Sequence, residues 1–314
     1  MKTAFLFPGQ GAQFVGMGKD LYEAFPSAGG IFERAEAASG LPLREFCFEG
    51  PEEKLAATDI CQPAIFTVSA ATLAVLDDLL GPERMAETRP EAMAGLSLGE
   101  YTALYAAGAM DFESGVRLVT RRGQLMQEAA QAVPSGMVSV IGLDEPKARE
   151  LCEAAAGDQV LSCANFNCPG QIVLSGQEEA CARAAELAGD FGASKAVALK
   201  VAGAFHSELM RPAAEEFAQA FDEITFTDPN VPVISNVTAE AYSSADEIRD
   251  RLLAQLTSPV LWQQSMEKLL AEGINRFFEI GPGRVLAGLM RRIQRRAEFH
   301  SLNARSAIEK MLDA

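Results

Sequence analysis

The chain has 314 residues, of which 48% are hydrophobic and 22% charged, and its formal net charge is −16. This is the composition of a globular protein with a full core, and its acidic balance argues against nucleic acid as a partner because phosphates would be repelled. No signal-peptide pattern opens the chain, and no apolar run approaches the roughly 18 to 20 residues of a spanning helix. We therefore expect a cytoplasmic protein with no membrane partner.

The cysteines and histidines give no metal-site pattern. The six cysteines are Cys47, Cys61, Cys152, Cys163, Cys168 and Cys181, and no two are spaced as C-x-x-C. With only two histidines in the chain, a structural zinc site is not expected. The sequence therefore predicts reduced thiols, no metal and no permanently bound cofactor.

The first 133 residues are predicted to alternate buried strands with helices. A strand over Thr3 to Phe7 ends in the loop Pro8-Gly9-Gln10-Gly11, and a second strand covers Met93 to Leu96. The predicted helices are Asp20 to Ser39, Pro51 to Ala57, Gln62 to Leu80, Glu100 to Gly108, and Ser114 to Ala132.

Residues 134 to 201 are predicted to form a separate series of strands and helices. Strands are predicted at Met137 to Ile141, Val160 to Asn165, Gln171 to Ser175 and Lys195 to Val201, and helices at Glu145 to Ala156, capped by Asp144, and at Gln177 to Phe191. The order β-α-β-β-α-β is the ferredoxin-like pattern. We interpret this segment as a small domain inserted in a larger one.

The remaining residues return to strands alternating with helices. Strands are predicted at Val233 to Asn236 and Arg276 to Ile280, and helices at Pro212 to Phe221, Glu247 to Leu256, Leu261 to Glu272 and about 284 to 297. This order favours an α/β fold, hydrolase-like, with a mostly parallel sheet and helices on both faces. Residues 1–133 and 202–314 would form the large catalytic domain, and 134–201 the ferredoxin-like small domain.

The most informative stretch is Gly95-Leu-Ser-Leu-Gly99, the only Gly-x-Ser-x-Gly in the chain. It lies between a predicted buried strand and a predicted helix, the context in which a turn lifts a serine hydroxyl clear of the sheet. The helix N-terminus beyond it offers unpaired N–H groups to a developing oxyanion. Ser97 is therefore the candidate nucleophile.

Such a serine needs a base, and only His206 and His300 carry an imidazole. His206 lies among small residues on a predicted loop, whereas His300 lies in a predicted strand, so His206 is the better candidate. A hydrolase would add an acid to orient the histidine, and none stands on an obvious strand-end loop between Ser97 and His206. A Ser-His dyad oriented by a main-chain carbonyl is the alternative to a triad.

Six motifs in order make the chain similar to malonyl-CoA:acyl-carrier-protein transacylases of the bacterial stand-alone type. They are Phe7-Pro-Gly-Gln-Gly-Ala-Gln13, Gly95-Leu-Ser-Leu-Gly-Glu-Tyr101, Arg122-Gly123, Asn165-Phe-Asn-x-Pro-Gly-Gln171, Gly203-Ala-Phe-His206 and Glu279-Ile-Gly-Pro-Gly283. Each motif alone is weak evidence for the family, but together the six motifs span nearly the whole chain. One departure is Leu96, where the family usually has a histidine, which leaves the range of acyl groups open.

The resemblance implies a ping-pong transfer of malonyl from malonyl-CoA, through an ester on Ser97, to the phosphopantetheine thiol of acyl carrier protein. His206 would be the general base and acid. The N–H groups of Gln10 and Leu98 would form the oxyanion hole, and the main-chain carbonyl near Leu261 would orient the histidine.

The resemblance also assigns residues to the substrate. Arg122 would hold the malonyl carboxylate, since a guanidinium grips a carboxylate through two charge-assisted hydrogen bonds. Phe205 would crowd a branched acyl group, Asn165, Asn167 and Gln171 would line the cleft, and Lys195 would lie near the CoA phosphates.

Partners follow from the same resemblance. We expect acyl carrier protein and malonyl-CoA as partners of a monomer, in fatty-acid or polyketide synthesis, with no nucleic acid. Five arginines could dock the acidic carrier, or they could pair with surface acids: Arg284, Arg291, Arg292, Arg295 and Arg296. The rival hypotheses are a serine esterase or thioesterase and a non-catalytic carrier-binding module.

Overall fold

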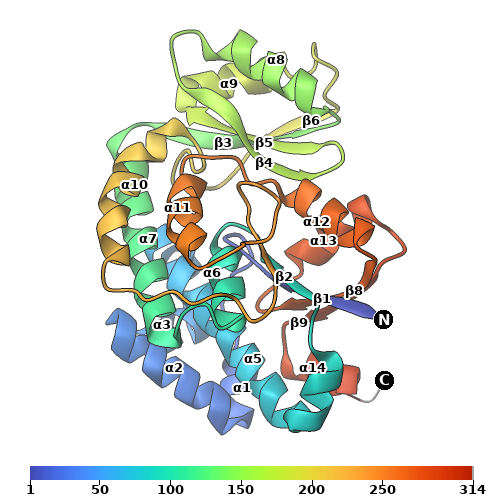
Figure 1. Ribbon diagram of the computed structural model, residues 1–314. Helices are drawn as coiled ribbons and strands as arrows, with labels where there is room; N and C mark the ends of the chain where they lie inside the picture. The colour runs from blue at the N-terminus through green and yellow to red at the C-terminus, as the bar shows by residue number, and fades with distance from the viewer. Residues whose placement is uncertain (313–314) are drawn as a thin grey trace.

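The computed structural model describes residues 1–312, and it describes their side chains except those of 82–87 (Figure 1). A five-stranded sheet lies at the centre of the larger part of the molecule. Its strands, in spatial order, are β7 (Val233–Ile234), β2 (Ala92–Gly95), β1 (Lys2–Phe7), β8 (Ile274–Ile280) and β9 (Glu298–Leu302). All four neighbouring pairs are parallel, so the predicted parallel sheet is confirmed.

Helices cover both faces of this sheet, as the hydrophobic pattern of β1 requires. Phe5 and Phe7 point into one apolar cluster, and Ala4 and Leu6 point into another. Successive side chains of a strand alternate between faces, so a central strand buried on both sides is apolar throughout. The predicted fold class is confirmed.

The helices before the small sheet are α1 (Lys19–Ala24), α2 (Pro26–Ser39), α3 (Leu43–Phe48), α4 (Glu52–Ala56), α5 (Thr58–Thr88), α6 (Leu98–Ala106) and α7 (Phe112–Ala132). The single helix predicted from Asp20 to Ser39 is two helices, because Phe25 is extended at φ −130° ahead of Pro26. Proline lacks an N–H and disfavours the helical conformation of the residue before it.

Helix α5 reaches the length and hydropathy of a membrane span. Thr58–Gly81 is 24 residues long with mean hydropathy 1.6, which corrects the expectation that no segment approaches such a length. Of its most apolar window, 67% is buried within the protein, and the helix packs against α2 and α7. Burial of this kind is typical of a core helix.

The helices after the small sheet are α10 (Arg211–Phe217), α11 (Asp246–Gln255), α12 (Trp262–Ala271), α13 (Val285–Ile293) and α14 (Arg305–Leu312), with 3₁₀ turns η1 (Glu208–Met210) and η2 (Ala218–Phe221). Helix α13 is shorter than predicted, because Gln294 is extended at φ −144° and ends it. Arg295 and Arg296 therefore lie beyond the helix.

The second sheet carries the predicted β-α-β-β-α-β order. Its elements are β3 (Ser135–Ile141), α8 (Glu145–Ala156), β4 (Leu161–Cys168), β5 (Gln171–Gln177), α9 (Glu178–Leu187) and β6 (Lys195–Ala198). The strands are antiparallel in the spatial order β4-β5-β3-β6, which is the ferredoxin-like arrangement. Asp144 caps α8 as predicted, since its Oδ1 accepts a hydrogen bond from Lys147 N at 3.1 Å.

One face of the small sheet is covered by α8 and α9, with the rest of the molecule on the other side (Figure 1). Strand β4 is tied to the larger part through two main-chain hydrogen bonds, Phe166 N to Val260 O at 3.0 Å and Val260 N to Ala164 O at 2.8 Å. This joint fixes the chain between α11 and α12 beside β4. The domain boundaries at 133/134 and 201/202 stay predictions.

Candidate active site

Ser97 lies on a sharp turn between β2 and α6, as the Gly-x-Ser-x-Gly pattern predicts. Its backbone has φ 51° and ψ −102°, an unusual conformation for a residue with a side chain. A Cβ on Gly95 would lie 1.8 Å from the main-chain carbon of Gly99, so the two glycines permit the turn. The turn is strained, and other contacts must hold it.

The loop after β1 is pressed against this turn. Leu96 N donates to Phe7 O at 3.1 Å, and a Cβ on Gly9 would lie 2.2 Å from Leu96 O. Gln10 follows directly, and its Nε2 donates to Thr58 Oγ1 at 3.4 Å. Only glycine allows the two loops to approach so closely.

The geometry is compatible with the predicted oxyanion hole. Ser97 N donates to Asn236 Oδ1 at 2.6 Å, so it is not free for a substrate oxygen. Leu98 is the first residue of α6, where N–H groups have no acceptor within the helix. The assignment of Gln10 N and Leu98 N stays a prediction.

The structure brings His206 to Ser97. His206 Nε2 lies 2.8 Å from Ser97 Oγ, and the histidine is buried on the loop before η1 at φ 58°. His300 is elsewhere, on β9, where its Nε2 lies 2.8 Å from Glu298 Oε1. The preference for His206 over His300 agrees with this geometry.

A main-chain carbonyl orients the histidine, but it is not that of Leu261. His206 Nδ1 lies 2.8 Å from Gln255 O at the end of α11, whereas Leu261 O accepts from Ser265. The prediction of Leu261 was wrong because the main chain that faces the imidazole is that of Gln255 and Ser258, a few residues before Leu261. Since Gln255 O can only accept, Nδ1 carries the proton and Nε2 is the free base.

Burial keeps this histidine neutral. Desolvation and the nearby Arg122 charge lower the pKa of His206 to about 4. An imidazole oriented by a carbonyl gains less from protonation than one beside a carboxylate. At neutral pH the group is therefore ready to accept a proton from Ser97.

Arg122 on α7 reaches the same hydroxyl from the other side. Its Nη2 donates to Ser97 Oγ at 3.0 Å and to Gln255 Oε1 at 2.9 Å, and its Nη1 donates to Gln62 Oε1 at 2.7 Å. The side chain is only 1% exposed, and its Nε has no partner among the described residues. Each of these hydrogen-bond partners is neutral, and the carboxyl group of Glu100 acts on the guanidinium only through space.

The adjacent Gly123 explains why α7 can place Arg122 this deeply. A Cβ on Gly123 would lie 2.7 Å from Thr58 O at the start of α5. The close approach of the two helices puts Gln62 within reach of the guanidinium.

The structure describes the remaining predicted residues and gives them no hydrogen bond to Ser97, His206 or Arg122. Phe205 is buried, and its carbonyl accepts from Ser175 Oγ at 2.6 Å. Asn165 lies opposite Val260, and Asn167 Oδ1 is buried without a partner among the described residues. Gln171 Oε1 accepts from Arg292 Nη1 at 3.2 Å, and Lys195 is exposed on the edge strand β6. Their roles toward substrate stay predictions.

The predicted residues omit four that shape the site: Gln62, Glu100, Asn236 and Gln255. Asn236 follows β7, and ligands of parallel sheets gather at the carboxyl ends of strands, so a signal for it existed. A buried glutamine on a helix has no such signal. Leu96 packs against the apolar cluster beneath the turn, so its difference from the family histidine alters packing beside Ser97.

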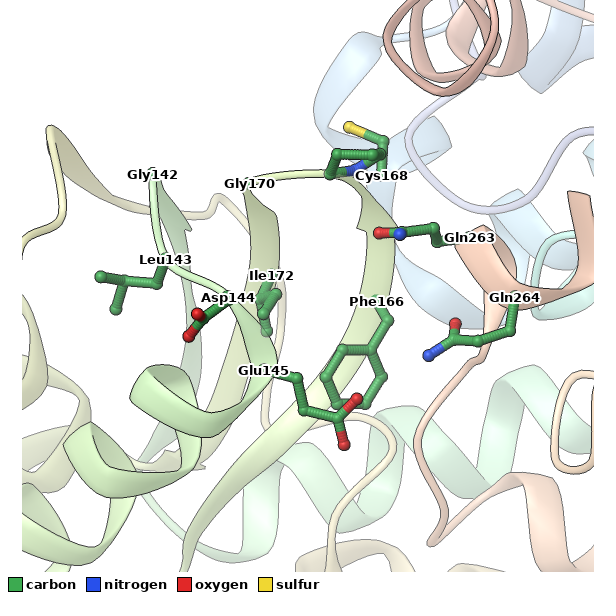
Figure 2. Close-up of a pocket in the computed structure, with 11 residues that line it drawn as sticks. Gly142, Leu143, Asp144, Glu145, Phe166, Cys168, Gly170, Ile172, Gln263 and Gln264 are labelled. Atoms are coloured by element: carbon green, nitrogen blue, oxygen red, sulfur yellow. The ribbon is translucent and has the colours of Figure 1, made fainter. Parts of the chain in front are cut away.

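A separate cleft of about 370 Å³ lies where the small sheet meets α12. Figure 2 shows Phe166 and Glu145 on the small-sheet side and Gln263 and Gln264 on the α12 side. Neither Ser97, His206 nor Arg122 lines it. Within the described residues, no group of three or more His, Cys, Asp or Glu could hold a metal ion.

Comparison with known proteins agrees with this site. A family model for the acyl transferase domain matches residues 4–304. The chain belongs to the acyl transferase family. It is 42% identical to the malonyl CoA-acyl carrier protein transacylase of Bacillus subtilis, over 98% of this chain and 95% of that protein, and 42% identical to that of Escherichia coli K12, over 99% and 98%.

Solved structures show the same fold. The malonyl CoA-acyl carrier protein transacylase of Coxiella burnetii superimposes with a TM-score of 0.95 at 39% identity, covering 100% of this chain and 97% of that one. A malonyl-transacylase in complex with a type II PKS acyl-carrier protein gives a TM-score of 0.93 at 40% identity, covering 100% and 99%.

Proposed function

We propose that this acyl transferase moves the malonyl group of malonyl-CoA to the phosphopantetheine thiol of an acyl carrier protein, through a malonyl ester on Ser97. One observation carries the proposal. The Ser97 hydroxyl lies between a neutral base, His206 Nε2 at 2.8 Å, and a buried guanidinium, Arg122 Nη2 at 3.0 Å.

In the first half-reaction, His206 Nε2 takes the proton of Ser97 as Oγ attacks the thioester carbonyl. The N–H groups of Gln10 and Leu98 donate to the oxyanion. The C–S bond then breaks, and His206 returns the proton to the departing CoA thiolate. The product is a malonyl-serine ester.

The second half-reaction reverses these roles. The carrier thiol gives its proton to His206 and attacks the ester carbonyl. The C–O bond to Ser97 breaks, and the hydroxyl regains its proton from His206. The reaction exchanges one thioester for another, so we propose that the protein needs no metal or permanently bound cofactor.

Arg122 selects the acyl group. Its positive charge is buried, its hydrogen-bond partners are amide and hydroxyl oxygens, and its Nε is unpartnered. A malonyl carboxylate would form a direct ion pair, which no hydrogen-bond partner of Arg122 supplies, whereas an acetyl group would leave the guanidinium buried against a methyl group. Phe205, which precedes the histidine, is proposed to limit branched acyl groups.

A serine esterase is not favoured. Such an enzyme orients its histidine with a carboxylate, whereas Nδ1 of His206 meets the carbonyl of Gln255. An esterase would also have no use for a buried Arg122 beside the nucleophile.

We propose that the carrier protein docks on the arginines around α13. Arg292 contacts Gln171 at the start of β5, so this surface joins the larger part of the molecule to the small sheet. A cavity of about 220 Å³ nearby is lined by Arg284, Arg291 and Arg295, among other residues. None of these four arginines forms an ion pair among the described residues, which leaves them open to an acidic partner.

The compartment, the oligomeric state and the pathway are part of the same proposal. All six cysteines are free and buried, which suits a reducing cytoplasm. We propose an enzyme that acts as a monomer, since Ser97, His206, Arg122 and Gln255 contact one another within a single chain. Supply of fatty-acid synthesis is our first choice of pathway, and a polyketide carrier is the alternative.

The direct test is the mass of the intact protein after brief mixing with malonyl-CoA or acetyl-CoA. The wild type is expected to gain a malonyl adduct and little acetyl adduct, and Ser97→Ala is expected to gain neither. Arg122→Ala should slow malonyl labelling about 10²-fold or more, because truncating one partner of a buried charge pair costs roughly 2 to 5 kcal/mol. Equal labelling by both thioesters would contradict the carboxylate role of Arg122.

Docking has its own test. Arg292→Glu should raise the KM for carrier protein while leaving labelling by malonyl-CoA intact, because it lies on the proposed docking surface and not at Ser97. Arg117→Glu on α7 is the matched charge reversal, because Arg117 is exposed and donates to a neutral oxygen, Ser114 Oγ at 3.0 Å, as Arg292 does to Gln171. An unchanged KM for Arg292→Glu would remove this surface from the proposal.

A further inference from the structure

Two side chains from outside the turn hold the strained backbone of Ser97. Asn236 Oδ1 accepts from Ser97 N at 2.6 Å, and Gln255 Nε2 donates to Ser97 O at 3.0 Å. The peptide groups on both sides of the nucleophile are therefore fixed by residues far along the chain. A backbone at φ 51° and ψ −102° persists only when its surroundings over-determine it.

Both holding residues meet at one buried carboxyl group, that of Glu100. Glu100 Oε1 accepts from Asn236 N at 3.2 Å and from Tyr242 OH at 2.6 Å, and Oε2 accepts from Gln255 Nε2 at 2.5 Å. The side chain is 0% exposed. Two of these partners, Asn236 N and Gln255 Nε2, can only donate, so the ionised carboxylate fits the site. A protonated carboxyl group could give its proton only to the Tyr242 hydroxyl, which would then have to turn from donor to acceptor.

The local sequence offers Glu100 a different role that it does not take. Ser97-Leu-Gly-Glu100 has the spacing of a capping box, in which the glutamate reaches back to the N–H of the N-cap serine. Here Asn236 takes that N–H and the N-cap serine makes no side-chain cap. The glutamate is thereby left to join the two segments that carry Asn236 and Gln255.

Gln255 connects this carboxyl group to all three reacting side chains. Its Oε1 accepts from Arg122, its main-chain carbonyl meets His206 Nδ1, and its Nε2 reaches Ser97 O as well as Glu100. Movement of Gln255 would therefore displace the nucleophile, the base and the carboxylate receptor together.

We propose that Glu100 is a positioning residue, whose ionised carboxylate fixes Asn236 and Gln255 and through them the geometry of Ser97, His206 and Arg122. The inference rests on the proposed acyl transfer. It assigns a role in the reaction to a residue that touches neither substrate nor the reacting atoms.

This role makes catalysis depend on the protonation of Glu100. Burial raises its pKa to about 7, although the donors Tyr242, Gln255, Asn236 and the Ser235 hydroxyl oppose the rise. The other titratable groups facing it are Arg122 on α7 and its neighbour Tyr101 on α6. Below about pH 7 the added proton must displace one of these donors or turn the Tyr242 hydroxyl into an acceptor, so the rate of acylation should fall although His206, with a pKa of about 4, is still neutral.

The test is the single-turnover rate of Ser97 acylation by malonyl-CoA, followed by mass and measured as a function of pH. Glu100→Gln should slow acylation about 10²-fold, the loss expected when reacting groups are displaced by about 1 Å. The amide places a fourth donor where three already converge. The remaining rate should be flat between about pH 5 and 8, because the titrating group is gone, whereas the wild-type rate should decline below about pH 7.

Glu279→Gln is the matched control. Glu279 is also 0% exposed and accepts only from donors, namely Leu286 N, Ala287 N and Ser301 Oγ, but it lies on β8 and contacts no residue of the site. It should lose stability and keep the wild-type acylation rate and pH profile. An equal loss in both variants, or a wild-type rate in Glu100→Gln, would overturn the positioning role.

Tyr242→Phe keeps the experiment decisive if Glu100→Gln does not fold. Removing one donor from the carboxylate should raise the pKa of Glu100, so the acid limb of the acylation rate should move to higher pH. An unmoved limb would refute the role. A wild type that never forms the malonyl adduct would instead overturn the proposed function, and the positioning role with it.

Discussion

Two strand–turn–helix units of the parallel sheet are built alike and used differently. The β2–α6 unit carries Ser97, and the β8–α13 unit carries the Gly281-Pro-Gly283 turn. Each contains a buried glutamate surrounded by donors. Glu279 accepts from Leu286 N and Ala287 N, seven and eight residues away at the start of α13, whereas the partners of Glu100 are 136, 142 and 155 residues away.

Glu279 caps the start of a helix, whereas Glu100 holds together residues of the active site that lie far apart in the sequence. Glu279 satisfies N–H groups that every helix start leaves unpaired, so its role is met within one unit and the neighbouring strand β9, which supplies Ser301 Oγ. Glu100 satisfies groups that belong to other segments, and its ionisation is coupled to where those segments lie. We expect mutations in the β8–α13 unit to affect stability alone, and mutations in the β2–α6 unit to affect stability and acylation together.

The largest expected effect is at Gly99 of α6. In Gly99→Ala the new Cβ would lie 2.1 Å from Phe7 O, so the turn or β1 must move. We expect a loss of about 3 kcal/mol or more in the free energy of unfolding, because overpacking against backbone cannot relax, together with loss of Ser97 labelling. Urea unfolding and adduct mass measure the two effects. A stable, active Gly99→Ala protein would show that the turn is less constrained than its geometry indicates.

The next effect is on how stability depends on pH. The pKa of His206 is lowered in the folded state, to about 4 from 6.5, so the unfolded state binds more protons in this window and stability is lost as pH falls. The pKa of Glu100 is raised, to about 7 from 4.5, so its contribution is present below pH 4.5 and is lost as pH rises through 7. Each contribution amounts to about 3 kcal/mol, and between pH 4.5 and 6.5 they oppose one another.

Single variants should separate the pH dependence of stability that comes from His206 from the one that comes from Glu100. Stability of His206→Ala should fall from about pH 4.5 to 7, and that of Glu100→Gln should rise from about pH 4 to 6.5, with the wild type flatter than either where the windows overlap. Urea unfolding across a pH series is the measurement. Identical pH dependence in all three proteins would contradict the shifted pKa values of both groups.

A smaller effect is expected at Ser301, which lies on β9 beside the second unit. Ser301→Ala removes the 2.8 Å hydrogen bond that Ser301 Oγ donates to Glu279 Oε2. The expected cost is about 1 kcal/mol of stability, the net worth of one hydrogen bond, and the acylation rate should not change. Thermal unfolding and single-turnover acylation together decide the matter, since a loss of rate would place the second unit in the catalytic machinery.

The smallest effect is at Gly288 of α13, the counterpart of Gly99. A Cβ at this exposed helical position meets nothing within 4 Å. Gly288→Ala should therefore stabilise the protein by about 0.5 to 1 kcal/mol, because glycine is a poor helix former. A destabilised variant would show that this face of α13 is packed more closely than its open surroundings indicate.

Local sequence pattern was sufficient to predict most helices and strands and to select Ser97 and His206 as the candidate reacting side chains. The apolar strand, the Gly-x-Ser-x-Gly turn and the following helix placed Ser97, and loop position separated His206 from His300. The break between α1 and α2 was readable at Pro26 and was missed. The orienting carbonyl was misplaced at Leu261, because nothing near Gln255 in the sequence shows that α11 ends beside the histidine.

The sequence by itself determined most strands and helices, the ferredoxin-like order, and the candidate nucleophile and base, whereas Arg122 came from the resemblance to a family. Periodicity, glycine spacing and turn chemistry act over a few residues, so they can be read without knowing the rest of the fold. Only the tertiary structure decided which buried groups meet. Glu100, Asn236, Gln255 and Arg122 find one another because parallel strands bring remote loops to one edge of the sheet, and a buried polar group must then take the partners that packing provides.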